Sequence, residues 1–156
     1  MREDKIQALL KTIDDEGIDL MHENFLRRSG IQGIYLKLEG IPPIIGIDRS
    51  IIPDFTLYTC VLAEELGHHF TTVGDLTGEY YSYRDKLIVS KEETLALKWA
   101  TEFLMPLEEL QHVKDLGMDN IYEVSDYLGV TREFLLKRFE FLRKQNIHIN
   151  LKTSCV

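Results

Sequence analysis

The sequence predicts a mostly helical α+β fold in which helices cover a small antiparallel sheet. Apolar residues recur at helical spacing over most of the chain. Residues 33–39 and 44–48 are rich in β-branched and aromatic side chains and are separated by a Gly-Ile-Pro-Pro turn, so they predict a hairpin. Near the C-terminus, a glycine at position 129 separates two further helical segments.

The first predicted element is an amphipathic helix over residues 3–16. Its apolar residues Ile6, Leu9 and Ile13 lie on one face, and Gly17 is a natural stop. Residues 18–25 are short and mixed, and they favour extended structure. We expect the hairpin that follows to cover one side of the next helix.

That next helix is predicted over residues 55–70, with Asp54 as its N-cap. Residues 75–90 contain Gly78 and three tyrosines and predict a loop, with a short strand at 86–89. A tyrosine in this loop could stabilise an oxyanion, but packing or surface roles are far more common. The tyrosines are Tyr80, Tyr81 and Tyr83.

A third helix is predicted over residues 91–105. Ser90 with Glu93 three residues later matches a capping box, and Pro106 interrupts the helix. A short helix over residues 106–116 then ends at Gly117.

The C-terminal part predicts a helix, a glycine turn and a second helix over residues 120–146. From Thr131 onward six Lys or Arg residues stand against two glutamates, a local excess of positive charge on an acidic chain. This pattern fits contact with DNA or an acidic partner. A helical pair packed on the core with a solvated basic face explains it equally simply, and we favour that interpretation.

Composition predicts a single compact unit, with a core over residues 1–118 and a helical extension packed on it over 119–156. The net charge of -8 argues against general binding to nucleic acids or membrane surfaces. No apolar run approaches the ~20 residues that span a bilayer, and the charged N-terminus has no signal-peptide core, so we expect a cytoplasmic protein. Cys60 and Cys155 have no metal-binding spacing and are expected to be free thiols, with Cys60 buried.

The most informative motif is Glu64-Glu65-x-x-His68, one residue away from the H-E-x-x-H helix of zinc peptidases. Residues four apart project from the same side of a helix, so Glu64 and His68 could bind one ion. Glu65 then holds the place of the general base. A carboxylate in the first ligand position can coordinate Zn²⁺, and a site with two carboxylates also suits a harder metal such as Mn²⁺.

The same motif occurs by chance in solvated helices, so its apolar surroundings matter. Val61, Leu62, Leu66 and Phe70 flank the charged residues, and buried charge is costly unless it is paired or metal-bound. Gly67 is a poor helix residue by about 1 kcal/mol, which suggests that another element packs closely there.

A catalytic zinc site needs a third protein ligand, and a glutamate on a downstream helix could supply it. The candidates are Glu92, Glu93 and Glu102. Only Glu93 shares a helix face with Ala96 and Ala100, which predicts that it points towards the core.

Together these motifs resemble the ImmA/IrrE metallopeptidase family over roughly residues 20–140. The resemblance rests on Leu62-Ala63-Glu64-Glu65-Leu66-Gly67-His68-His69, on Glu93-x-x-Ala96-x-x-Trp99-Ala100, on Leu104-Met105-Pro106, and on Asp126-Tyr127-Leu128-Gly129-Val130-Thr131.

The resemblance implies a minimal zincin-like domain with an active-site helix, a third-ligand helix and a C-terminal helix-turn-helix-like pair. It implies a metalloendopeptidase with Glu64, His68 and Glu93 as metal ligands and Glu65 as general base. It also implies a Zn²⁺ cofactor, carriage on phages or other mobile elements, and an anti-repressor that promotes cleavage of a partner repressor. The departure from the family pattern is Glu64, which stands where the first ligand is usually His.

Two alternatives remain at this stage. A non-catalytic relative would bind the repressor through the same cleft, and a DNA-binding regulator would use residues 120–146. His69 projects about 100° away from His68 around the helix and is expected to lie outside the metal site. The remaining histidines show no suggestive spacing; they are His22, His112 and His148.

Overall fold

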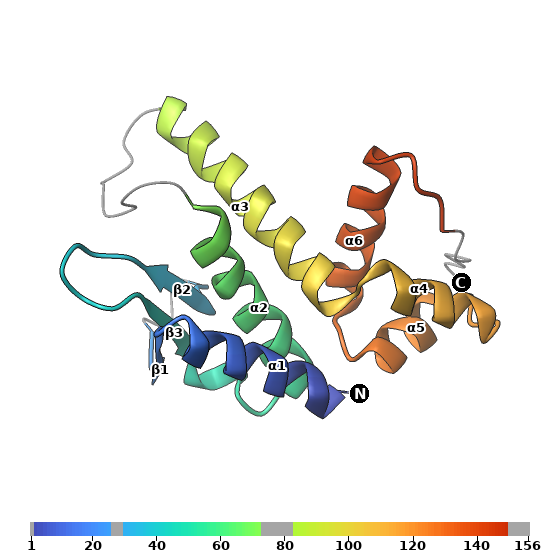
Figure 1. The fold of residues 1–156 in the computed structure, drawn as a ribbon, viewed down its shortest axis with the longest axis horizontal. Coiled ribbons are helices and arrows are strands. Elements are labelled where there is room, and N and C mark those ends of the chain that lie inside the picture. The colour runs from blue at the N-terminus through green and yellow to red at the C-terminus, as the bar shows by residue number, and fades with distance from the viewer. Residues whose placement is uncertain (1, 26–29, 73–82, 150–156) are drawn as a thin grey trace.

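The computed structural model describes residues 2–25, 30–72 and 83–149, and at residues 2 and 83–90 it describes only the backbone. Six helices and three strands lie within these ranges, with one short 3₁₀ turn, η1 (Arg49–Ile51). The sheet lies at one side of the molecule, and α4, α5 and α6 lie at the other side. Helices α2 and α3 cross the middle of the molecule between them (Figure 1). The α+β class predicted from the sequence is confirmed.

The N-terminal helix α1 (Arg2–Asp15) leads directly into the first strand, β1 (Asp19–Glu23). Gly17 between them has φ +64°, a left-handed conformation that favours glycine at a helix end. The helix and the extended segment predicted here are both confirmed.

The sheet has the strand order β1-β3-β2. Strands β2 (Gly33–Leu36) and β3 (Ile44–Asp48) are antiparallel with Tyr35 opposite Ile45, as the hairpin prediction requires. However, β1 pairs parallel to β3, so the sheet is mixed and not wholly antiparallel. The apolar pattern of a strand indicates which side chains are buried but does not encode the direction of its partner.

The central helix is α2 (Phe55–Thr71), and the carboxylate of Asp54 accepts a hydrogen bond from the backbone N–H of Leu57 at 3.0 Å. The predicted helix and its N-cap are therefore confirmed. Strand β2 packs along this helix, so the sheet covers one side of it as expected.

The next helix, α3 (Tyr83–Leu104), begins eight residues before the predicted start at Lys91. Ser90 lies inside the helix, so the predicted N-cap and the predicted strand at 86–89 are wrong. A short apolar run such as Leu87-Ile88-Val89 fits a strand or a buried helix equally well, and no Gly or Pro interrupts residues 83–90. The rest of the predicted loop, with Tyr80 and Tyr81, lies outside the described residues.

Three shorter helices complete the fold: α4 (Leu107–Asp115), α5 (Ile121–Leu128) and α6 (Arg132–Lys144). Gly117 and Gly129 end α4 and α5 with φ +77° and +68°. Thr131 caps α6 by accepting a hydrogen bond from the N–H of Phe134 at 3.2 Å. The helix-turn-helix-like pair is confirmed, whereas the division of the chain at residue 118 stays a prediction.

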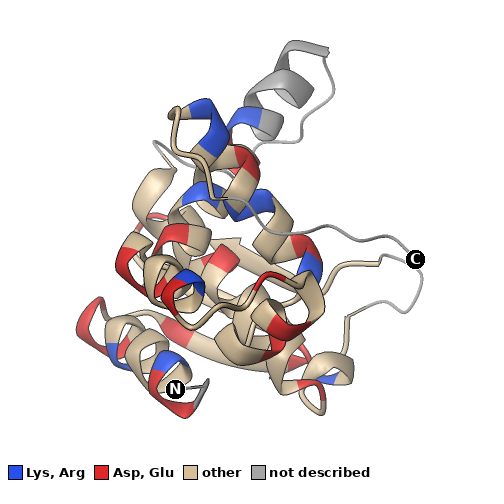
Figure 2. Cartoon of the chain, turned by 90° about the vertical axis from the view of Figure 1, so that its right-hand side faces the viewer, with Lys and Arg blue, Asp and Glu red and all other residues tan. Residues whose placement is uncertain are grey.

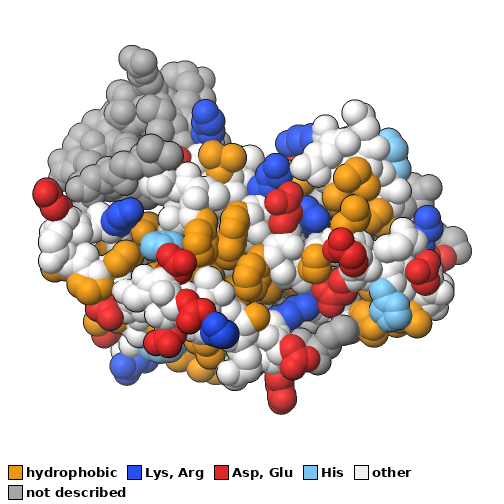
Figure 3. Space-filling model, in the orientation of Figure 1, with side chains coloured by type: hydrophobic (Ala, Val, Ile, Leu, Met, Phe, Trp, Pro, Cys, Tyr) orange, Lys and Arg blue, Asp and Glu red, His pale blue; other side chains and the backbone are white. Residues whose placement is uncertain are grey.

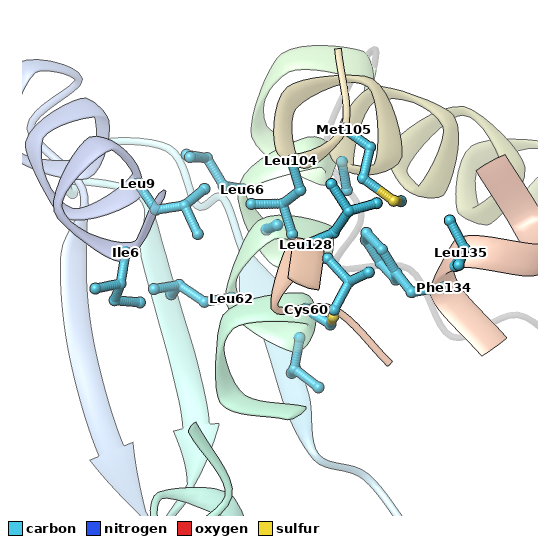
Figure 4. Close-up of a cluster of buried hydrophobic side chains, with 14 of the residues drawn as sticks. Ile6, Leu9, Cys60, Leu62, Leu66, Leu104, Met105, Leu128, Phe134 and Leu135 are labelled. Atoms are coloured by element: carbon cyan, nitrogen blue, oxygen red, sulfur yellow. The ribbon is translucent and has the colours of Figure 1, made fainter. Parts of the chain in front are cut away.

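The core is continuous through α2, which buries apolar side chains on both flanks (Figure 4). Ile6 and Leu9 of α1 lie against Leu62 and Leu66 on one flank. On the other flank Cys60 lies among side chains from the C-terminal helices. In the part of the chain that the structure describes, no helix is long and apolar enough to cross a membrane.

Candidate metal centre

The two helices of the candidate site approach each other most closely at Gly67 of α2. A Cβ placed on Gly67 would lie 2.4 Å from the carbonyl oxygen of Ala96 in α3. Such a distance excludes any side chain, so the glycine allows the two backbones to touch. This confirms that another element packs closely at Gly67, and it explains why Ala96 is fully buried.

This approach brings His68 and Glu93 together, because each lies within one helical turn of the contact. The Nε2 atom of His68 is 3.4 Å from Oε2 of Glu93. Two ligands on one tetrahedral Zn²⁺ at 2.0–2.1 Å are separated by about 3.3–3.4 Å. The pair therefore already has the spacing that two ligands of one metal ion would have.

His68 is 7 % exposed, and its Nδ1 is buried without a hydrogen-bond partner among the residues that the structure describes. The side chain of Glu93 is 54 % exposed, so the prediction that it points towards the core is wrong. The pair lies at the edge of the protein with Glu93 on the solvent side. Ala96 and Ala100, one and two turns further along α3, are both fully buried. Since α3 begins at Tyr83, Glu93 lies in its interior and is not a capping residue.

Three glutamates interact electrostatically with the imidazole of His68, and burial and these charges shift the pKa values of all four groups. Burial, followed by the charge of Glu93, raises the pKa of Glu64, and His68 partly offsets the rise. Burial raises the pKa of Glu65 to about 8. The hydrogen bond with His68 lowers the pKa of Glu93. Burial lowers the pKa of His68, but the hydrogen bond and the charges of the three glutamates outweigh it, so that pKa is raised overall.

Burial therefore favours the protonated forms of Glu64 and Glu65, and a cation bound beside them would favour their ionised forms instead. One imidazole nitrogen with carboxylate oxygens is a donor set that suits Zn²⁺ and Mn²⁺. The residues present therefore fit a divalent ion chemically. Within the described ranges, however, no three His, Cys, Asp or Glu side chains are already arranged as a metal-binding group.

The structure thus brings two of the three predicted ligands into contact and places Glu64 close enough to interact electrostatically with both. A complete three-ligand site therefore requires these side chains to rearrange. The assignment of Glu64, His68 and Glu93 as ligands, and of Glu65 as base, stays a prediction.

Glu65 points towards the sheet and lies directly against strand β2. A Cβ on Gly33 would be 2.6 Å from Oε1 of Glu65 and 2.7 Å from Cγ1 of Val61. The missing side chain at Gly33 therefore makes room for the Glu65 carboxylate. Because β2 is an edge strand, Glu65 sits beneath the open side of the sheet.

His69 binds two partners that the sequence did not indicate. Its Nδ1 lies 3.0 Å from the hydroxyl of Tyr35 in β2, and its Nε2 lies 3.2 Å from Oε2 of Glu16. This confirms that His69 lies outside the candidate metal pair. Alternation along β2 could have placed Tyr35 on the face towards α2, but no local signal identifies Glu16.

An aromatic row continues from His69 along the two helices. Phe70 stacks on Trp99 with ring centroids 4.8 Å apart, and Trp99 stacks on Phe103 at 5.0 Å. Hydrophobic side chains gather in the middle of the molecular face drawn in Figure 3, over α2 and α3. The row links the helix that carries His68 to the helix that carries Glu93.

Glu102, a rejected ligand candidate, has a different partner. Its Oε1 accepts a hydrogen bond from Nη1 of Arg138 at 3.2 Å, while Nε of Arg138 donates to the carbonyl oxygen of Met105 at 3.1 Å. Arg138 is 5 % exposed and therefore contributes to packing between α3 and α6. One of the basic residues in the C-terminal excess is thus internal.

Other basic residues of α6 also have partners within the protein. The guanidinium of Arg132 lies 4.8 Å from the ring centre of Tyr122. Lys137 and Lys144 each place Nζ 2.9 Å from a carboxylate oxygen of Glu140. Figure 2, which views the side of the C-terminal helices, shows acidic positions interspersed among the basic ones.

Comparison with known proteins identifies one family. The family model described as IrrE N-terminal-like domain, Peptidase_M78, matches residues 14–140, which is most of the chain. A search of curated proteins finds no match. The matched range contains the whole Glu64–Glu65–His68 segment, Glu93 and the helix-turn-helix-like pair.

Proposed function

The chain belongs to the Peptidase_M78 family of IrrE N-terminal-like domains, and from this premise we propose that it is a metal-dependent endopeptidase. The observation that carries the proposal is the 3.4 Å separation of His68 Nε2 and Glu93 Oε2, contributed by two different helices. That spacing fits two ligands of a single tetrahedral ion.

In the proposed site Glu64, His68 and Glu93 hold a divalent cation, Zn²⁺ or Mn²⁺, and Glu65 lies beside it. When bound, the cation acts as a Lewis acid that lowers the pKa of water and polarises the peptide carbonyl. Glu65 accepts the proton of the attacking water on its carboxylate and delivers it to the departing amine. Added positive charge lowers the pKa of Glu65 from about 8, which keeps the base ionised.

The substrate segment is proposed to bind in an extended conformation along β2. Among the described residues no strand pairs with the outer edge of β2, and an extended peptide can pair with such an edge through backbone hydrogen bonds. Because Gly33 of β2 contacts Glu65, a peptide bound there would lie close to the base.

We further propose that the substrate is a repressor protein and that the chain acts in the cytoplasm as an anti-repressor for a phage or other mobile element. Membership of the IrrE-like family supports this role. The acidic charge of -8 and the pairing of Lys137 and Lys144 with Glu140 favour a protein partner over direct contact with DNA.

A non-catalytic repressor-binding relative is the second candidate. Two observations favour it: Glu64 stands at the first ligand position, and no three-ligand group is preformed among the described residues. In this case the same cleft would bind the repressor without cutting it.

Metal binding and cleavage together test the proposal. We expect isothermal titration to show one Zn²⁺ or Mn²⁺ per chain, lost in Glu93→Gln and retained in Glu92→Gln, a neighbouring glutamate on the same helix. Glu65→Gln should still bind metal but should not cleave the repressor of the same mobile element when the two are coexpressed. If Glu65→Gln lowers repression as well as the unmodified protein does, the binding relative is the correct description.

A further inference from the structure

Both edge strands of the sheet are hydrogen-bonded to α2 by a tyrosine–histidine pair. On one edge, the hydroxyl of Tyr35 in β2 lies 3.0 Å from Nδ1 of His69 in α2. On the other, Nε2 of His22 in β1 lies 2.8 Å from the hydroxyl of Tyr58 in α2. The two pairs use the same chemistry with the residue types exchanged, so one is a natural control for the other.

The β2 pair differs because its histidine has a second partner. Nε2 of His69 lies 3.2 Å from Oε2 of Glu16, which directly follows α1. With Nε2–H donating to Glu16, Nδ1 is free to accept from the Tyr35 hydroxyl. His69 therefore ties β2, α2 and the end of α1 together, and Tyr35 is only 6 % exposed.

This link lies one helical turn from the proposed base. Gly33 and Tyr35 are two residues apart and face the same side of β2, while Glu65 and His69 are four residues apart on α2. Gly33 meets Glu65 with no side chain between them, as the 2.6 Å distance to an added Cβ shows. Any shift of β2 along or away from α2 therefore changes the distance between the strand edge and Glu65.

We propose that His69 is a positioning residue: by bonding to Tyr35 and Glu16 it holds the edge strand β2 at the height above Glu65 that an extended peptide substrate requires. The inference rests on the proposed peptidase function. It assigns His69 a role in substrate binding by the strand and none in holding the metal. The competing explanation is that the pair only stabilises the fold, as the Tyr58–His22 pair does on the other edge.

The test compares Tyr35→Phe, His69→Leu and His69→Gln with the matched control Tyr58→Phe. Tyr35→Phe and Tyr58→Phe each remove one tyrosine–histidine hydrogen bond between α2 and an edge strand. The glutamine side chain can accept from Tyr35 and donate to Glu16, so His69→Gln should rescue what His69→Leu loses.

Two small molecules that bind the zinc-loaded protein distinguish binding along the strand from binding to the metal. Acetohydroxamate reports the metal alone, whereas a tripeptide hydroxamate must also bind along β2. Titration calorimetry should give unchanged affinity for acetohydroxamate in all four variants. Tripeptide hydroxamate should bind about five- to tenfold more weakly to Tyr35→Phe, as expected for one lost hydrogen bond, and more weakly still to His69→Leu. It should bind normally to Tyr58→Phe and His69→Gln.

If Tyr35→Phe and Tyr58→Phe weaken the binding of tripeptide hydroxamate equally, the proposal is overturned. The Tyr35–His69 pair would then be a contact that only stabilises the fold. Failure of the proposed metal site is recognised separately, since acetohydroxamate would then not bind the unmodified protein. In that case hydrogen exchange decides whether His69 holds β2. Faster exchange of residues 33–36 in His69→Leu, absent in Tyr58→Phe, would support the positioning role, and equal exchange would overturn it.

Discussion

Gly67 of α2 and Ala96 of α3 meet backbone to backbone, with an added Cβ on Gly67 only 2.4 Å from the Ala96 carbonyl oxygen. Alanine in place of an interior helix glycine normally stabilises by about 1 kcal/mol. Overpacking costs about 1–3 kcal/mol, and here the obstructing atoms belong to a backbone that cannot rotate away. For Gly67→Ala, the cost of overpacking should therefore exceed the stability gained from the higher helix propensity of alanine.

The first prediction follows from this contact. We expect Gly67→Ala to lower the free energy of unfolding by about 1–2 kcal/mol in urea denaturation and to weaken metal binding by separating His68 from Glu93. Adding Ala96→Gly should not restore stability, because the clash is with main-chain atoms. Full recovery in the double variant would show that the side chain of Ala96 is the obstacle.

The second prediction concerns the buried guanidinium of Arg138, which is 5 % exposed and donates to the carbonyl of Met105 and to Glu102. Arg138→Met keeps most of the volume but removes both donors, so we expect a loss of about 1–3 kcal/mol in urea unfolding. Lys137→Met, which breaks an exposed pair with Glu140, should cost less than about 1 kcal/mol. A neutral or stabilising Arg138→Met would mean that desolvation of the guanidinium offsets its hydrogen bonds.

The third prediction concerns the Cys60 thiol, which is 3 % exposed and accepts a hydrogen bond from the N–H of Thr131 at 3.4 Å. Burial raises its pKa from 9.0 to about 11, and only the thiolate reacts readily. In a Cys155→Ser background, Cys60 should react with iodoacetamide at pH 8 at least about a hundredfold more slowly in the folded protein than in urea, because two pKa units reduce the thiolate by that factor. Similar rates in both conditions would contradict a closed contact between α2 and the start of α6.

The fourth prediction is a pH dependence that arises on α6. Hydrogen bonds from Lys144 and then Lys137 lower the pKa of Glu140 from 4.5 to about 2. A carboxylate with a lowered folded-state pKa stabilises the protein above its unfolded value of 4.5, and the contribution is lost as the pH falls through about 2. The melting temperature of Glu140→Gln should therefore be lower than that of the unmodified protein at pH 7, with the gap closing towards pH 2.

Salt provides the control for Glu140. Because the ion pairs of Glu140 are exposed, high ionic strength should reduce the difference in melting temperature between Glu140→Gln and the unmodified protein at pH 7. A difference that persists at pH 2 or in high salt would show that Glu140 acts through helix packing and not through its charge.

Elements with local signals could be predicted from the sequence. Asp54 and Thr131 mark helix starts with side chains that satisfy free backbone N–H groups, and Gly17, Gly117 and Gly129 mark helix ends with left-handed φ angles. The small residues on one face of α3 predicted that Glu93 points towards the core; its side chain is instead 54 % exposed, although it does lie beside His68.

Features that depend on contacts between distant residues could not be predicted. One local signal was also misleading: the start of α3 was misplaced because Ser90 with Glu93 imitates a capping box, although helix-forming residues precede Ser90. The parallel pairing of β1 and the link from Tyr35 through His69 to Glu16 join segments far apart in the chain. Arg138 looked like part of a solvated basic face, and only its contact with Met105 shows that it is internal.

The aromatic row gives the molecule an intrinsic optical reporter. Trp99 is the chain's single tryptophan, and it is sandwiched between Phe70 of α2 and Phe103 of its own helix. We therefore expect its emission to change when the helix bearing His68 moves relative to the helix bearing Glu93. A relative movement of these two helices can be followed in unlabelled protein, by fluorescence alone, before any substrate has been identified.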